Sequence, residues 1–314
     1  MLKVGLIGVG GISAAHISAW KSLEDAKLVA LCDIREEQMA KYPDVHHYCN
    51  FEDMLENEAL DVVDICLPTY LHADYSIKAM ERGIHVICEK PISLNAEDVA
   101  RVYSAAHKNQ VKFMVAQVLR FWPEYELLKG IYDSQKYGKL LSASFTRLSS
   151  TPKWSWDNWM KDESRSGLVP FDLHIHDLDF IISTFGKPTN MCKHRSKRPE
   201  QDYFHIVYEY DGFFISAQSS WFASQYPFTA GYCAQFEKAV VAYENGSCKI
   251  FEDNGKVIDM ESASEEDTGS INLPKSDAYA NEIRYFADCV LSNTFPEKVK
   301  PEELTAVIEL LHKV

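Results

Sequence analysis

Apolar residues in the first 120 positions occur in short runs separated by segments of helical spacing. The runs that predict buried strands are residues 2–7, 27–32, 62–67, 85–88 and 111–116. Helical spacing is found between them, notably at residues 12–20, 70–82 and 96–108. Buried strands that alternate with amphipathic helices are typical of βαβ units, whose parallel sheet is covered on both faces. We therefore predict an α/β domain over residues 1–120.

The pattern changes after residue 120, where strands with alternating apolar and polar positions predominate. Residues 203–210 have this period of two, and Asp211-Gly212 then supplies a hairpin turn. The same turn chemistry recurs at Asn245-Gly246 and Asn254-Gly255, because these dipeptides tolerate the positive φ of tight hairpins. Helices are expected from Pro123 and near residues 170–184, 278–292 and 301–313. Residues 261–270 are polar and predict a loop.

These elements predict a second, α+β domain over residues 121–314. Its core is expected to be a large, mostly antiparallel open sheet, and the last helix is expected to pack back on the first domain. A chain of 314 residues is long enough for two such domains, since single cores usually stop growing near ~250 residues.

Composition excludes several classes of function. The 46 acidic residues outnumber the 32 Lys and Arg, and a net charge of −14 argues against a nucleic-acid partner. No apolar stretch approaches the ~20 residues of a membrane span, and the apolar N-terminus is interpreted as a strand, not a signal peptide. The eight cysteines form no CxxC pair, which favours free thiols in the reducing cytoplasm.

The segment after the first predicted strand has the spacing of a dinucleotide-binding turn. Gly8, Gly10 and Ser13 occupy the three positions of GxGxxG, so the backbone of Gly8 to Ile12, Gly11 included, is expected to approach a pyrophosphate at a helix N-terminus. Asp33 ends the second strand, 20 residues after Ser13, where a carboxylate can bind the adenosine ribose. Its charge favours NAD over NADP, although Arg35 leaves NADP use open.

A lysine follows the predicted strand at residues 85–88. Lys90 lies in the sequence Glu89-Lys90-Pro91, and ligands of open α/β sheets bind beyond the carboxyl ends of the strands. Pro91 restricts Lys90 to non-helical backbone geometry. We expect Lys90 to face the cofactor crevice; a surface lysine in a turn is the alternative.

The segment at residues 172–179, DLHIHDLD, combines carboxylates and imidazoles at helical spacing. Asp172 and His176 are four residues apart and share one face of a helix. His176 is a candidate general base, and Asp172 or Asp179 can orient it. His174, His176 and Asp177 also resemble a metal-ligand cluster. The two histidines of an HxH sequence bind one ion most easily when they lie on a strand, whereas this segment has helical spacing, so we expect no metal.

The ordered set of motifs resembles the glucose–fructose oxidoreductase / inositol dehydrogenase / MocA family. The motifs are GVGGIS, Asp33, PTYLH at 68–72, EKP at 89–91, AQVLRFWPEY at 116–125, Asp172-xxx-His176, and AYANEIRYFADCV at 278–290. The resemblance covers essentially the whole chain. It implies a Rossmann domain followed by an α+β domain whose open sheet forms a homodimer or homotetramer.

The resemblance also implies a reaction and its residues. It implies NAD(P)-dependent oxidation of a sugar, sugar derivative or cyclitol, with Lys90 bonded to the reacting hydroxyl, Asp172 binding substrate and His176 taking the hydroxyl proton. It extends the cofactor-binding set to Pro68, Thr69, His72, Glu89 and Gln117. Two alternatives remain open: an NAD-dependent glycosidase that works by transient oxidation and elimination, and a non-catalytic NAD-responsive regulator.

Further residues are candidates for the substrate pocket. Trp154, Trp156 and Trp159 can stack on sugar rings, although ordinary packing explains tryptophans equally well. Arg120 is expected either to contact cofactor or substrate or to form a structural salt bridge. His174 stands where many family members have a small residue, and we expect it to line the substrate pocket. A further departure is Leu67-Pro68-Thr69, where the family has Thr-Pro-Asn.

Overall fold

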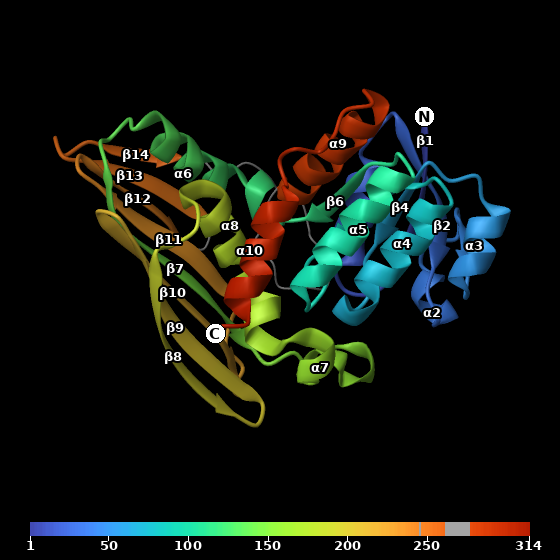
Figure 1. Ribbon diagram of the computed structural model, residues 1–314, viewed down its shortest axis with the longest axis horizontal. Coiled ribbons are helices and arrows are strands. Elements are labelled where there is room, and N and C mark those ends of the chain that lie inside the picture. The colour runs from blue at the N-terminus through green and yellow to red at the C-terminus, as the bar shows by residue number, and fades with distance from the viewer. Residues whose placement is uncertain (245, 261–276) are drawn as a thin grey trace. The chain divides into compact units, whose positions relative to one another are not determined.

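The computed structural model describes residues 1–244, 246–260 and 277–314 (Figure 1). The contacts divide these residues into two compact units. Unit 1 comprises residues 1–118 and 278–305, and unit 2 comprises the described residues of 119–260 together with 277 and 306–314. The polar loop predicted at 261–270 and Asn245 of a predicted hairpin turn lie outside the described residues.

Unit 1 is built on a six-stranded parallel sheet in the order β3-β2-β1-β4-β5-β6. This is the strand order of a doubly wound dinucleotide-binding fold, whose order reverses between β1 and β4. The strands are β1 (Leu2–Ile7), β2 (Ala26–Cys32), β3 (His46–Tyr48), β4 (Val62–Ile65), β5 (His85–Glu89) and β6 (Phe113–Ala116).

Helices connect these strands because their apolar stripes need a face of the sheet to cover. They are α1 (Ser13–Lys21), α2 (Glu36–Met39), α3 (Phe51–Asn57), the 3₁₀ turn η1 (Thr69–Leu71), α4 (His72–Glu81) and α5 (Ala96–Lys108), and the unit also contains α9 (Ala278–Leu291), which follows the last strand that the structure describes. The late helix α9 packs against α1: the Tyr279 and His16 rings lie 5.9 Å apart, and Arg284 binds Asp25 at 2.7 Å. Residues distant in sequence therefore complete the first unit.

Unit 2 is built on an eight-stranded sheet in the order β14-β13-β12-β11-β7-β10-β9-β8. The pairing is antiparallel except between β7 and β10, which are parallel. The strands are β7 (Leu140–Ser150), β8 (Asn190–Arg198), β9 (Gln201–Tyr210), β10 (Phe213–Phe222), β11 (Thr229–Phe236), β12 (Ala239–Glu244), β13 (Ser247–Glu252) and β14 (Val257–Met260). The expected mixture of one parallel and one mostly antiparallel sheet is confirmed.

One face of this sheet is covered by α6 (Pro123–Ser134) and α8 (Ile175–Phe185) (Figure 1). The ring of Tyr125 on α6 packs edge-on against Phe180 of α8 at 4.9 Å and against Tyr232 of β11 at 5.2 Å. The remaining helical segments are η2 (Val118–Phe121), η3 (Trp156–Lys161), α7 (Glu163–Ser166), η4 (Pro170–His174) and α10 (Pro301–Leu311).

The strand pattern predicted at residues 203–210 is confirmed. Phe204, Ile206 and Tyr208 are fully buried on the helix-covered face, whereas Tyr203 is exposed on the other. Gly212 adopts φ +86° in the turn between β9 and β10, as its hairpin position requires. All eight cysteines are free thiols. In the part of the chain that the structure describes, no helix is both long and apolar enough to cross a membrane.

Candidate active site

The turn between β1 and α1 has the backbone geometry that the glycine spacing predicts. Gly8 has φ +91°, and a Cβ atom there would lie 2.5 Å from the carbonyl oxygen of Cys66. Gly10 differs, because a Cβ atom built on it meets no atom within 4 Å. Ser13 is buried and its Oγ donates to the carbonyl of Gly10 at 2.7 Å. Gly8 thus allows the turn to pack against the backbone that follows β4, and Gly10 leaves open space beside the backbone.

The helix that follows this turn begins without a side-chain cap. Its N-cap residue, Ile12, contributes no side-chain hydrogen bond, and no acidic residue lies in the first turn. Gly11 and Ile12 are half-buried. The first N–H groups of a helix and its positive dipole end favour an anion, so the turn fits a dinucleotide pyrophosphate.

Asp33 lies directly after β2, as expected, and its carboxylate already has protein partners. One oxygen accepts from the Val9 N–H at 2.8 Å, and the other accepts from the Arg35 N–H at 2.9 Å and lies 3.3 Å from Arg35 Nε. A carboxylate has about four acceptor positions, so a ribose hydroxyl can still bind. The bond to Val9 fixes the carboxylate relative to the glycine turn.

The residues after β4 have structural partners within unit 1. His72 is buried; its Nδ1 lies 2.7 Å from the carbonyl oxygen of Pro91, and its Nε2 lies 2.6 Å from that of Leu67. The ring therefore ties the turn after β4 to the turn after β5. Pro68 is half-buried at the start of η1, whereas Thr69 and Gln117 are buried.

Glu89 is the last residue of β5 and lies buried behind Lys90. Its Oε2 accepts from the Lys90 N–H at 2.9 Å, and its Oε1 lies 3.1 Å from Nε2 of His16. The side chain of Lys90 is half-buried, and the Lys90–Pro91 peptide bond is cis. Lys90 therefore lies at the carboxyl end of a central strand, with its backbone held by the preceding side chain.

The cluster around His16 was missed by the sequence analysis. Asp64, fully buried in β4, accepts from Nδ1 of His16 at 2.9 Å and from Nε1 of Trp20 at 2.7 Å. The only signal was a carboxylate in an apolar strand, VVDICL, where a buried charge needs a partner. The partner lies 48 residues away and cannot be identified from spacing.

The same cluster contains the one metal-ligand group found in the described residues, formed by His16, Asp64 and Cys66. Burial raises the pKa of the Cys66 thiol to about 12, so the thiolate that a metal requires is disfavoured. His16 Nδ1 is bonded to Asp64, and its other ring nitrogen faces Glu89. The donor set fits a buried hydrogen-bond network better than a metal.

In unit 2, the candidate catalytic helix begins with a π-helical turn, η4, which continues into α8. Such turns are rare and frequently found at functional sites. Asp172 and His176 are half-buried, whereas every other side chain from residue 170 to residue 182 is buried. Asp172 and His176 are therefore the two residues between 170 and 182 that are not fully buried in the core.

The neighbouring acidic residues pair with arginines. Arg120 and Asp179 form a buried bidentate salt bridge, with both N–O distances 2.7 Å. Arg147 binds Asp177 in the same way at 2.8 and 3.0 Å and also donates to the Tyr125 hydroxyl. Arg120 thus forms a structural salt bridge, which was the alternative to a contact with cofactor or substrate. The pairing of Asp177 removes it from the alternative metal cluster.

His174, which was expected to line the substrate pocket, lies in the core of unit 2. Its side chain is fully buried on the inner face of the sheet, where Nε2 lies 2.6 Å from the Tyr208 hydroxyl. Its ring packs edge-on against Phe204 at 4.9 Å. Burial and the charge of Arg147 lower the pKa of His174 to about 3, so the ring is a neutral core residue.

The three tryptophans lie on the surface of unit 2 and not in its core. Trp154 is 62% exposed, Trp156 is 39% exposed, and Trp159 is half-buried. Between them, Asp157 and Asn158 have φ values of +50° and +51°, a conformation that non-glycine residues rarely adopt. Backbone strain of this kind concentrates at ligand-binding segments.

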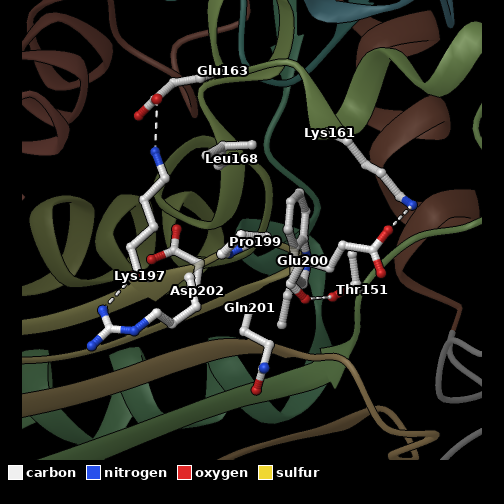
Figure 2. Close-up of a pocket in the computed structure, with 11 residues that line it drawn as sticks. Thr151, Lys161, Glu163, Leu168, Lys197, Pro199, Glu200, Gln201 and Asp202 are labelled. Carbon is white, nitrogen blue, oxygen red and sulfur yellow. Dashed lines mark hydrogen bonds and ion pairs between the residues drawn. The ribbon is translucent and has the colours of Figure 1, made fainter.

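A pocket of about 520 Å³ lies beside this segment, between α7 and the β8–β9 hairpin (Figure 2). Two ion pairs, Lys161–Glu200 and Lys197–Glu163, each 2.7 Å long, link its two sides. Both of its lysines are thus already paired, Arg198 donates to the carbonyl of Lys197 at 2.8 Å, and the pocket contains none of the predicted site residues. Its lining comprises Thr151, Lys161, Glu163, Leu168, Lys197, Arg198, Pro199, Glu200, Gln201, Asp202 and Trp221.

Comparison with known protein families matches both halves of the chain. Residues 2–117 match the oxidoreductase family with an NAD-binding Rossmann fold, and residues 125–248 match the GFO/IDH/MocA C-terminal domain. The chain belongs to the GFO/IDH/MocA oxidoreductase family. The resemblance inferred from the ordered motifs is thereby confirmed, and the family is one that binds NAD.

Curated relatives in this family include sugar and cyclitol dehydrogenases. Glucose-6-phosphate 3-dehydrogenase of Bacillus subtilis is 26% identical over 190 residues, which cover 59% of this chain and 54% of that protein. Myo-inositol 2-dehydrogenase of Thermotoga maritima is 29% identical over 191 residues, covering 59% and 55%. The chain thus spans about half the length of the curated relatives it matches.

Solved structures share the fold over nearly the whole chain. An oxidoreductase from Agrobacterium radiobacter, in complex with NAD⁺, L-tartaric acid and magnesium, has a TM-score of 0.83 at 17% identity and covers 99% of this chain and 94% of its own. A levoglucosan dehydrogenase in complex with NADH and levoglucosan has a TM-score of 0.81 at 17% identity, covering 99% and 97%. At this identity the likeness shows the fold.

Proposed function

We propose that the protein is an NAD(P)-dependent dehydrogenase that oxidises a CH–OH group of a sugar, sugar derivative or cyclitol. The observation that carries the proposal is the pair Asp172 and His176, which one helix presents outside the core in a chain whose other unit has an NAD-binding fold. The dehydrogenases among its relatives support the substrate class.

The proposed reaction divides its work between the two units. The nicotinamide supplies the hydride acceptor when it is bound. His176 takes the hydroxyl proton as general base, and Asp172 orients the imidazole or binds a neighbouring hydroxyl. The Lys90 ammonium stabilises the negative charge that develops on the oxygen. The carbinol hydrogen leaves as hydride and the hydroxyl proton passes to His176, so the products are a ketone or aldehyde, NADH and a proton.

The cofactor proposal rests on the glycine turn and Asp33. The pyrophosphate is placed at the N-terminus of α1, where Gly10 leaves open space, and the adenosine ribose is placed at Asp33. The Asp33 carboxylate repels a 2′-phosphate, and Arg35 already contacts this carboxylate. NAD is therefore the preferred cofactor.

The eight free cysteines support a reducing compartment, the cytoplasm.

We assign the tryptophan segment to the substrate. Exposed indole rings suit the apolar faces of sugars, and the adjacent Asp157 and Arg165, paired at 3.0 Å, offer groups for hydroxyls.

The uncovered face of the large sheet carries Tyr203, Phe214 and Phe251, which are 37%, 49% and 43% exposed. Exposed aromatic side chains on this sheet face favour a homodimer or homotetramer through this surface, which light scattering tests directly.

The test is a panel of sugars and cyclitols with NAD and with NADP, followed by NADH absorbance. Lys90→Met and His176→Ala should each reduce turnover by about 10²–10⁴-fold while NAD binding persists. Matched controls are Lys27→Met and His194→Ala, which remove exposed side chains of the same types from β2 and β8. Wild-type turnover in both active-site variants would overturn the assignment. NADH must accumulate; product release without NADH would indicate the glycosidase alternative.

A further inference from the structure

Three buried ionisable groups form a continuous chain in unit 1, behind the segment that carries Lys90. Asp64 on β4, His16 on α1 and Glu89 on β5 are all buried. The imidazole lies between the carboxylates, with Nδ1 2.9 Å from Asp64 and Nε2 3.1 Å from Glu89. Only an imidazolium can donate to both carboxylates at once, since a neutral ring has a single N–H.

Electrostatics favour that charged form of His16. Burial by itself lowers the pKa of the imidazole, but the charge of Asp64 and the hydrogen bond to it outweigh burial and raise the pKa well above 6.5. Burial likewise opposes the charge on Glu89, and the hydrogen bond and charge of His16 hold the pKa of Glu89 below 4.5. The chain is thus carboxylate, imidazolium, carboxylate.

This chain ends at the backbone of Lys90. The oxygen of Glu89 that does not face His16 accepts the Lys90 N–H at 2.9 Å. The next residue is held independently, because the carbonyl of Pro91 lies 2.7 Å from Nδ1 of the buried His72. The Glu89–Lys90 peptide unit is therefore held by the Glu89 carboxylate that His16 contacts, and the Pro91–Ile92 peptide unit is held by His72.

Stability alone does not explain such an arrangement. Buried ion pairs often contribute little net stability, because the cost of desolvating the charges offsets their attraction, and apolar residues of similar volume do as well. The charged chain instead restricts the orientation of its side chains. It gives Glu89 one orientation, and that orientation fixes the point from which the Lys90 side chain leaves the backbone.

We propose that His16 is a positioning residue for Lys90: it orients Glu89, whose carboxylate holds the Lys90 N–H and aims the ammonium group at the reacting hydroxyl. The proposal rests on the proposed function, in which Lys90 stabilises charge on that hydroxyl oxygen. His16 itself touches neither cofactor nor substrate in this account.

The kinetic test compares His16→Gln and Glu89→Gln with a control that only lowers stability. Met54→Ala is such a control, because it opens a cavity at a fully buried core residue of α3 outside the chain of ionisable groups. We expect kcat to fall about 10–100-fold in both glutamine variants, while the Kd for NAD changes less than about threefold in His16→Gln. The double variant should be no slower than the slower single variant, as expected for residues that act through one contact.

A second measurement needs no turnover. The Lys90 amide hydrogen should exchange with solvent at least about tenfold faster in His16→Gln than in Met54→Ala at equal global stability. Unchanged exchange and unchanged kcat in His16→Gln would overturn the positioning role, as would an equal loss of kcat in Met54→Ala. If the wild type oxidises no alcohol in the panel, the proposed function fails, and the exchange rate alone then decides whether His16 holds Lys90.

Discussion

Two glycines of the same turn should respond to the same substitution in opposite ways. Gly10→Ala adds a methyl group where no atom lies within 4 Å, so the free energy of unfolding should change by less than about 0.5 kcal/mol. The added methyl group projects into the space proposed for the pyrophosphate. NAD affinity should therefore fall by at least about tenfold, or roughly 1.4 kcal/mol.

Gly8→Ala should instead destabilise the fold. Alanine at φ +91° costs about 1–2 kcal/mol in backbone strain, and its Cβ would lie 2.5 Å from the Cys66 carbonyl oxygen and 2.9 Å from the Leu67 nitrogen. Both contacts are with backbone atoms, so the turn after β4 has to move. We expect a total loss of about 2–4 kcal/mol, which lowers Tm by roughly 5–15 °C for a domain of this size.

Calorimetry and NAD titration of the same samples separate the two effects. Gly130→Ala is the matched control, since Gly130 lies exposed inside α6 of unit 2 with open space around it. It should raise stability by about 0.5–1 kcal/mol and leave NAD binding unchanged. Wild-type NAD affinity in Gly10→Ala would refute the placement of the dinucleotide at this turn.

Three further predictions concern buried groups. His174→Phe should alter Tm but not the KM for substrate. A tenfold rise in KM would indicate that His174 lines the substrate pocket. Asp177→Asn leaves Arg147 buried without its counter-charge and should cost about 3–5 kcal/mol of stability by urea unfolding. Folding raises the pKa of His16 above 6.5, so the protonated imidazole stabilises the fold; this stabilisation is complete below pH 6.5 and is lost as the pH rises through the raised pKa. Folding lowers the pKa of Glu89 below 4.5, so the ionised carboxylate stabilises the fold, and this stabilisation is lost as the pH falls below 4.5. The urea concentration at the unfolding midpoint should therefore be highest between pH 4.5 and pH 6.5, and His16→Gln should flatten the dependence of this midpoint on pH.

The sequence predicted those elements whose apolar pattern is set by a large buried surface. Residues 2–7 and 96–108 were predicted with the bounds that β1 and α5 have. The short strand β3 was missed, because its three residues are exposed or half-buried and have no apolar pattern. The helix α3 was missed although Asn50 caps it through hydrogen bonds to the Glu52 and Asp53 N–H groups.

The candidate site was predictable only as far as local motifs describe it. The spacing of Gly8, Gly10 and Asp33 anticipated their places in the turn and after β2. The partners of Arg120 and His16 were not predictable, because Asp179 lies 59 residues from Arg120, and Glu89 lies 73 residues from His16. Such contacts depend on which strands become neighbours, and periodicity does not carry that information.

In the proposed reaction, Lys90 and His176 act on one hydroxyl beside one nicotinamide. A crystal structure of the protein with NADH and a reactive sugar or cyclitol measures this directly. We expect both nitrogens within hydrogen-bond reach of the same substrate oxygen, roughly 2.6–3.2 Å, with the pyrophosphate on the turn at Gly10. A bound substrate whose reacting carbon lies at the nicotinamide while either nitrogen lies beyond reach of its oxygen would contradict it.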